Sequence, residues 1–237
     1  MRAWTKLLIA LVILAGLFVA VDRIAVGVAD SKVAERIQSH EHLNTKPHVS
    51  IEGFPFLTQV LSKKLDSVRL SADDLEISGG GHKATLRSFT AHISGVRVNS
   101  SFSSATADSA QGTALISYAD LTSLLGQGAT LSYAGDGKVK ITGKVDTPLG
   151  KVDGSGTARL AVRKGNSITV GDVSVSALGG GIDLGSLPGG VGSALGSLLA
   201  PSLKLAGLPV GLSLESVQPQ ADGVSIGFTG HNLNLAG

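Results

Sequence analysis

The chain opens with a long apolar segment between charged residues. Fifteen uncharged residues run from Leu7 to Val21. Arg2 and Lys6 precede them, and Asp22 follows. A basic start before an apolar core of this length is the pattern of a secretory signal, and about 20 apolar residues would cross a bilayer. The pattern predicts a signal sequence or signal anchor in residues 1–21.

The fate of this segment stays open between retention and cleavage. Counted from Ala3 the apolar stretch reaches 19 residues, with Lys6 able to extend to the membrane edge. The best cleavage motif, Gly27-Val28-Ala29, lies far beyond the apolar core, so we favour a retained anchor over cleavage. The basic tail then stays in the cytoplasm and residues 22–237 fold outside it as one domain. A buried core helix is the alternative that this charge asymmetry disfavours.

The segment after the anchor has the periodicity of a helix. Apolar residues recur at helical spacing between Asp22 and His40, and charged residues occupy the other faces. We expect this helix to leave the membrane and pack on the domain, or to continue the anchor helix. The apolar positions are Ile24, Val28, Ala29, Val33 and Ile37.

A short amphipathic helix is predicted next. Val49 to Glu52 alternates as a strand, and Pro55 then favours a helix start. Lys63 and Lys64 stand at the predicted helix end, where cations complement the helix dipole. The apolar residues of this segment are Phe54, Phe56, Leu57, Val60 and Leu61.

The remaining chain alternates with period two, which predicts antiparallel strands. The alternation changes phase near Asp74 and Ser88, which predicts bulges or sheet bends there. Ser117 and Gly126 bound a further helix as its caps. We count about ten short strands and three or four helices, the last after a glycine-rich loop from Gly179 to Gly196. The clearest strands are 68–77, 84–98, 130–133, 138–147, 151–163, 168–177, 213–218 and 223–228. The fold class is therefore α+β with an antiparallel sheet.

Composition narrows the function. The chain has no cysteine, which excludes disulfides and thiolate chemistry. Its net charge of +2 is scattered, so nucleic acid is a poor partner. Only 16% of residues are charged, against about 25% in an ordinary soluble domain. Such an aliphatic chain fits a large core, an apolar cavity or a membrane-facing patch.

No motif indicates catalysis or a cofactor. His40, Glu41, His42 and His48 could chelate a metal, but no further ligand has convincing spacing, and a solvated turn is the better interpretation. The acids between residues 73 and 76 fit a solvated strand face. The glycine pairs lack the residues of a phosphate loop or a nucleophile elbow. We expect no enzyme, no metal and no cofactor.

An apolar ligand suits the pattern better. Alternating strands with small and aliphatic side chains can form a smooth concave wall that binds an acyl chain, although the same residues also suit a plain core. The predicted apolar contacts are Phe54, Phe56, Leu57, Val60 and Leu61, with Lys63 and Lys64 as headgroup partners or simply a helix end.

The segment from Ile51 to Leu61, with its motif Gly53-Phe54-Pro55-Phe56-Leu57, resembles the actinobacterial LmeA family of phospholipid-binding proteins. The anchor, the helix after it, the strand from Val68 to Ile77, the helix from Ser117 to Leu125 and the segment Leu208-Pro209-Val210-Gly211-Leu212 are also similar. The resemblance covers most of the chain after the anchor. We expect the glycine-rich stretch to be particular to this chain.

The resemblance implies a periplasmic, membrane-associated protein that binds phospholipids, including phosphoinositides. It also implies support of mannan elongation in mycobacterial lipoglycans and a fold like tubular lipid-binding (TULIP-like) domains, in which a curved sheet wraps a long helix. The family supplies no catalytic motif. The partners predicted are phospholipid and membrane. The alternative is a ligand-free scaffold that stabilises an envelope glycosyltransferase.

Overall fold

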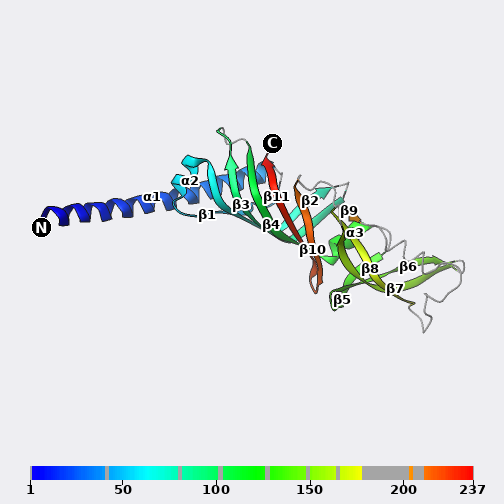
Figure 1. The fold of residues 1–237 in the computed structure, drawn as a ribbon. Coiled ribbons are helices and arrows are strands. Elements are labelled where there is room, and N and C mark those ends of the chain that lie inside the picture. The colour runs from blue at the N-terminus through cyan, green and yellow to red at the C-terminus, as the bar shows by residue number, and fades with distance from the viewer. Residues whose placement is uncertain are drawn as a thin grey trace. The chain divides into compact units, whose positions relative to one another are not determined.

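The computed structural model describes residues 2–40, 43–79, 82–100, 104–125, 129–147, 150–163, 166–177, 203–204 and 211–236. Its helices are α1 (Arg2–His40), α2 (Phe56–Ser62) and α3 (Tyr118–Leu125). Its strands are β1 (His48–Glu52), β2 (Lys64–Gly79), β3 (His82–Val98), β4 (Ala105–Ile116), β5 (Ala129–Gly135), β6 (Lys138–Thr147), β7 (Gly150–Arg163), β8 (Ser167–Ala177), β9 (Leu203–Lys204), β10 (Leu212–Gln220) and β11 (Gly223–Ala236). Figure 1 shows the order of these elements along the chain.

The strands form two sheets. One has the order β1-β2-β3-β4-β11-β10, and the other has the order β5-β6-β7-β8-β9. Every pair whose register is defined is antiparallel. The α+β class, with a long helix and curved antiparallel sheet, is confirmed.

The chain divides into two compact units, each assembled from separate stretches of sequence. The first unit comprises residues 1–72, 90–110 and 231–237, and the second comprises residues 73–89 and 111–230. The predicted boundary at residue 21, between the anchor and the folded domain, stays a prediction. Helix α1 passes through that position without a break.

Helix α1 has two different halves. The side chains from Ala3 to Val21 are exposed, whereas the second half contacts β1 and α2. Figure 1 shows the first half extending away from β1, along which the second half runs. The predicted helix after the anchor thus continues the anchor helix and also packs on the domain. Asp22 and Ala34 are the buried residues of this helix.

In the first unit, α1 packs on the edge strand β1. Val49 and Ile51 of β1 are buried, as the alternating pattern predicts. Because β1 is an edge strand, its outer backbone groups need partners. Helix α1 supplies one such partner, because Asp30 Oδ1 accepts a hydrogen bond of 2.8 Å from the backbone N–H of Ile51.

In the second unit, the hairpin strands pack in register. Val139 of β6 lies opposite Ala158 of β7, and both are buried. The Phe89 and Phe228 rings stack with centroids 5.7 Å apart. These contacts remove apolar surface from water, which is the main stabilising contribution to such a core.

The predicted helix cap at Ser117 is present in a modified form. Ser117 Oγ accepts a hydrogen bond of 3.1 Å from the backbone N–H of Asp120. The Asp120 carboxylate accepts from the Ser117 hydroxyl and, at 3.3 Å, from the backbone N–H of Thr85 on β3. The acid at this position therefore also ties α3 to a strand, which a capping box alone would not do.

The predicted strand 138–147 coincides with β6, and β7 and β8 agree with their predicted ranges within one residue, whereas β2 is longer than the predicted 68–77. β2 and β3 have 16 and 17 residues. The phase change predicted at Asp74 coincides with a left-handed backbone there, at a φ of 49°. The glycine-rich stretch from Gly179 to Gly196, and the helix expected after it, lie outside the described residues.

Candidate functional site

The residues predicted to contact lipid lie in or beside α2, but their exposure differs. Phe54, just before the helix, is 57% exposed, and Leu61 in its last turn is 82% exposed. Phe56 is only 5% exposed and belongs to the core. Leu57 and Val60 are half-buried. The structure therefore separates an outward-facing pair, Phe54 and Leu61, from an inward-facing Phe56.

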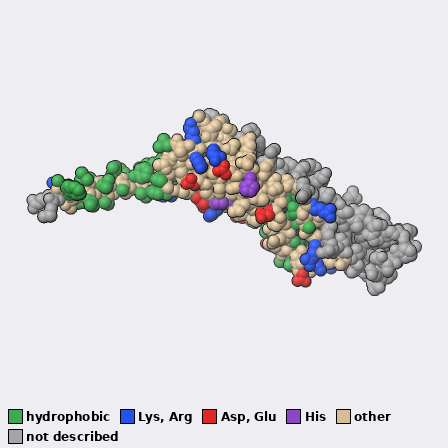
Figure 2. All heavy atoms as spheres, in the orientation of Figure 1, with side chains coloured by type: hydrophobic (Ala, Val, Ile, Leu, Met, Phe, Trp, Pro, Cys, Tyr) green, Lys and Arg blue, Asp and Glu red, His purple; other side chains and the backbone are tan. Residues whose placement is uncertain are grey.

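The two predicted basic residues follow α2 directly. Lys63 is the C-cap residue, with a left-handed φ of 55°, and Lys64 begins β2. Both side chains are exposed. Lys63 Nζ donates a hydrogen bond of 2.9 Å to Ser100 Oγ. Figure 2 shows basic side chains over the region of α2, beside the apolar side chains along the first half of α1.

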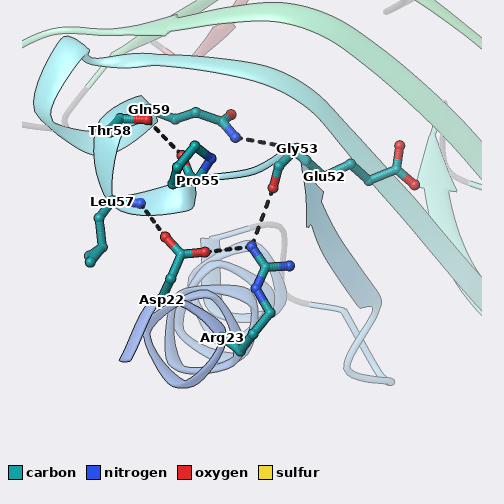
Figure 3. Close-up of polar contacts among 8 residues, drawn as sticks. All are labelled: Asp22, Arg23, Glu52, Gly53, Pro55, Leu57, Thr58 and Gln59. Carbon is teal, nitrogen blue, oxygen red and sulfur yellow. Dashed lines mark hydrogen bonds and ion pairs between the residues drawn. The ribbon is translucent and has the colours of Figure 1, made fainter. Parts of the chain in front are cut away.

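Helix α2 is capped by a residue far away in sequence. Its N-cap residue is Pro55, which makes no side-chain hydrogen bond to the helix. Asp22 of α1 takes that role, since its Oδ1 accepts a hydrogen bond of 2.8 Å from the backbone N–H of Leu57. Free N–H groups at a helix start need such an acceptor. Figure 3 shows the Asp22 carboxylate pointing at this N–H.

Arg23 completes the tie between α1 and the start of α2. Its guanidinium lies 2.5 Å from Asp22 Oδ2 and donates a hydrogen bond of 3.4 Å to the carbonyl of Gly53. The same guanidinium lies 5.2 Å from the centre of the Phe54 ring, within the range of a cation–π contact. We call Asp22, Arg23, Gly53 and Leu57 the α1–α2 clasp.

The carboxyl of Asp22 is held in its charged form. Asp22 is the first residue after the apolar run, and its side chain is inaccessible to solvent. Burial by itself raises the pKa of this carboxyl, but the Leu57 N–H, Arg23 and the Phe56 N–H together outweigh it and hold the pKa below its ordinary value of 3.8. A charged Asp22 is thus part of the folded state at neutral pH.

Gln59 joins the far side of α2 to the sheet. It is buried, its Nε2 donates to the carbonyl of Glu52 at 3.3 Å, and its Oε1 accepts from the backbone N–H of Asp66 at 2.8 Å. Both ends of the amide are therefore paired, as buried polar groups require. Gln59 connects the end of β1 with the start of β2, so α2 is fixed from both sides.

Gly53 of the motif is required by geometry. Its φ is 101°, a conformation that side chains rarely adopt. A Cβ there would also lie 2.5 Å from Gln59 Nε2 and 3.0 Å from Asp66 Oδ2. The glycine thus lets the chain pass close to Gln59 and presents its carbonyl to Arg23.

A second polar group, on β1, β2 and β3, was not predicted. Ser67 Oγ donates to Glu52 Oε2 at 3.2 Å and lies 3.2 Å from His92 Nε2, while Arg69 pairs with Glu52 at 3.0 Å. In a nucleophilic triad the carboxylate orients the imidazole, whereas here it accepts from the serine hydroxyl. We therefore attribute a structural role to this group.

Helix α1 is long and apolar enough to cross a membrane, from Ala3 to His40 by length and composition. Among the described residues, no group of three or more histidine, aspartate or glutamate side chains could hold a metal ion. Glu41 and His42 of the histidine cluster lie outside those residues. The site on α2 is therefore an apolar and basic surface beside a candidate membrane helix.

An α+β fold with an exposed apolar and basic surface is compatible with a lipid-binding protein, but a fold alone does not identify a function. The chain matches the family model described as LmeA-like phospholipid-binding over residues 20–229, and it belongs to that family. The resemblance found in the sequence is thereby confirmed, and the family is one of binding proteins rather than enzymes. Neither curated proteins nor solved structures gave a match, so the likeness to tubular lipid-binding domains stays a prediction.

Sequence reasoning found α2 but missed the residues that hold it. The sequence pattern marks Asp22 only as the end of the apolar run, and it assigns no role to Arg23 or Gln59. The available signal was the pair of opposite charges directly after the apolar run. It did not reveal that Asp22 reaches Leu57, 35 residues further along the chain.

Proposed function

We propose that this protein is a non-enzymatic, membrane-anchored phospholipid-binding protein of the cell envelope. Phosphoinositides are among its proposed ligands, and assembly of lipoglycans or other envelope lipids is the process it supports. The observation that carries the proposal is the exposed apolar pair Phe54 and Leu61, next to Lys63 and Lys64, in a chain of a phospholipid-binding family.

The arrangement suits the two chemical parts of a phospholipid. Phe54 and Leu61 offer apolar surface to an acyl chain, and burying each methylene stabilises the complex by about 0.8 kcal/mol. Lys63 and Lys64 offer ammonium groups to a phosphate. An inositol phosphate headgroup carries more negative charge than phosphatidylcholine, so it gains more from these lysines.

The experiment is native mass spectrometry of the full chain, released from detergent after addition of phospholipid. We expect one phospholipid per chain for the wild type and preference for phosphatidylinositol over phosphatidylcholine. The double variant Phe54→Ser/Leu61→Ser should lose most of this bound fraction. Tyr133→Ser, which replaces another exposed aromatic residue, should keep it.

Two results would overturn the proposal. One is a wild-type chain that carries no phospholipid at any added concentration. The other is equal loss of lipid in the α2 variant and in Tyr133→Ser, because a specific role of α2 requires the two to differ. Turnover of an added glycolipid by the pure protein would contradict the non-enzymatic part.

A further inference from the structure

The position of α2 relative to the anchor is fixed by covalent continuity and one short hydrogen bond. Asp22 directly follows Val21, the last residue of the apolar run, within the unbroken helix α1. Its carboxylate accepts from the Leu57 N–H at 2.8 Å. A helix rises about 1.5 Å per residue, so the first turn of α2 lies close to the level at which the apolar run ends.

The apolar surface continues from the anchor onto this part of the protein. Ile24 and Val28 of α1, beyond the clasp, are still more than half exposed, as are Phe54 and Leu61. Leu57 and Leu61 are four residues apart and so share one side of α2. In Figure 3 the Leu57 side chain points away from the strands.

The charges of the same surface suit a headgroup layer. Lys63 and Lys64 are exposed at the end of α2, and Arg23 is half exposed beside the Phe54 ring. Aromatic and basic side chains together are typical of the membrane interface, where rings sit at headgroup level and cations contact lipid phosphates.

We propose that α2 is a second point of membrane attachment. The exposed Leu61 of α2 and the residues Phe54, Lys63 and Lys64 that flank the helix insert into the headgroup layer of the same bilayer that receives residues 3–21. This inference rests on the proposed function, because it takes the anchor as retained. The clasp then fixes the rotation of the anchored protein and holds α2 at the surface from which a phospholipid would leave.

The test places tryptophan at the proposed contact. The natural Trp4 is first replaced in the full chain by Trp4→Phe, and Phe54→Trp or Leu61→Trp is then added. Each chain is reconstituted in nanodiscs that contain phosphatidylglycerol and a phospholipid with a nitroxide quencher either near the headgroup or near the chain end. We expect the shallow quencher to reduce both emissions at least about twofold more than the deep one.

His40→Trp is the matched control. His40 is exposed, and it lies 18 residues beyond Asp22 on α1, or roughly 27 Å along the helix axis. Its emission should change little with either quencher. In nanodiscs with phosphatidylglycerol, adding Lys63→Gln/Lys64→Gln should weaken the effect of the shallow quencher. The quenching should fall toward the value that the chain with both lysines shows in nanodiscs of phosphatidylcholine alone.

The outcomes separate the two proposals. Shallow quenching at positions 54 and 61, but not at 40, supports the attachment even where native mass spectrometry finds no bound phospholipid. Emission at 54 and 61 that is quenched no more than at 40 overturns the attachment, while a phospholipid found by mass spectrometry would still support the proposed function. A face that binds another protein instead would also show no quenching.

Discussion

At the scale of single residues, Asp22 determines how α2 begins. Pro55 is a suitable helix start because its backbone is pre-set, but it makes no side-chain cap. The buried carboxylate of Asp22 supplies the missing acceptor and is itself balanced by Arg23. A buried charge is tolerated only with such partners, so the clasp depends on the Asp22 carboxylate, the Arg23 guanidinium and the Leu57 N–H together.

The depressed pKa of Asp22 makes this contribution dependent on pH. The folded pKa lies below the unfolded value of 3.8, so the stabilisation is fully present above about pH 3.8 and is lost as the pH falls through the folded pKa. We expect Asp22→Asn in detergent to unfold a few degrees below the wild type at neutral pH. Thermal unfolding followed by circular dichroism at several pH values measures this gap.

The difference between the two chains is the informative quantity, because every other titrating group is common to both. The gap should be constant from neutral pH down to about pH 5 and should close below about pH 4. A gap that grows on acidification would contradict the assigned direction of the pKa shift. Asp108→Asn, at an exposed ion pair with Arg97, is the control and should change stability less.

At the scale of elements, local patterns were predicted well and distant contacts were not. The spacing of Phe56, Leu57, Val60 and Leu61 predicted α2, because a short amphipathic helix is encoded within one turn or two. The change of phase at Asp74 marked a real break in strand geometry. A contact such as that of Asp22 with Leu57 depends on the tertiary fold, so the periodicity of a single segment does not predict it.

Some strands were missed because their residues carry little strand signal. Most of β4 consists of alanine, serine, threonine and other small or polar residues, which rarely mark a strand on their own. The extension of β11 beyond Phe228 contains Gly230 and Asn232, the latter with a φ of 52°. Pairing with neighbouring strands overrides these weak local preferences.

A second element-level contact can be tested at the edge strand. Asp30 of α1 accepts the N–H of Ile51 on β1, so two acids fix α1 in place: Asp22 ties it to α2 and Asp30 ties it to β1. We expect Asp30→Ala to speed hydrogen exchange of the Ile51 amide by about tenfold, since one lost hydrogen bond is worth about 1 kcal/mol or more. Exchange measured by NMR or mass spectrometry gives this rate.

The control for this experiment keeps the acceptor. Asp30→Asn retains an oxygen at the same position and should exchange more slowly than Asp30→Ala. Equal rates in both variants would show that the side chain does not protect β1. Amides of β7 and β8, which lie in the other unit, should be unaffected by either change.

At the scale of the whole molecule, the anchor and the folded part share one unbroken helix, α1. Cleavage after Gly27-Val28-Ala29 would leave a chain beginning at Asp30, without Asp22 and Arg23. The clasp would then be lost. The family match begins at residue 20, so both clasp residues of α1 lie within the matched range. The structure thus gives a physical reason against cleavage at this motif, in addition to its distance from the apolar core.

Two truncated chains test this argument. A chain of residues 20–237 keeps the clasp, whereas a chain of residues 30–237 lacks it and eight further residues of α1 that precede Asp30. We expect the shorter chain to unfold roughly 5 °C or more below the longer one, because a helix cap and the first contacts of α1 with α2 are removed. Thermal unfolding of both chains gives the difference between their midpoints. Adding Asp22→Asn to the longer chain should lower its midpoint by only part of this difference.

Equal midpoints would show that the fold does not need the segment before Asp30, and cleavage there would then be compatible with a stable exported protein. A lower midpoint for the shorter chain would instead show that residues 20–29 stabilise the fold, which argues against cleavage after Ala29.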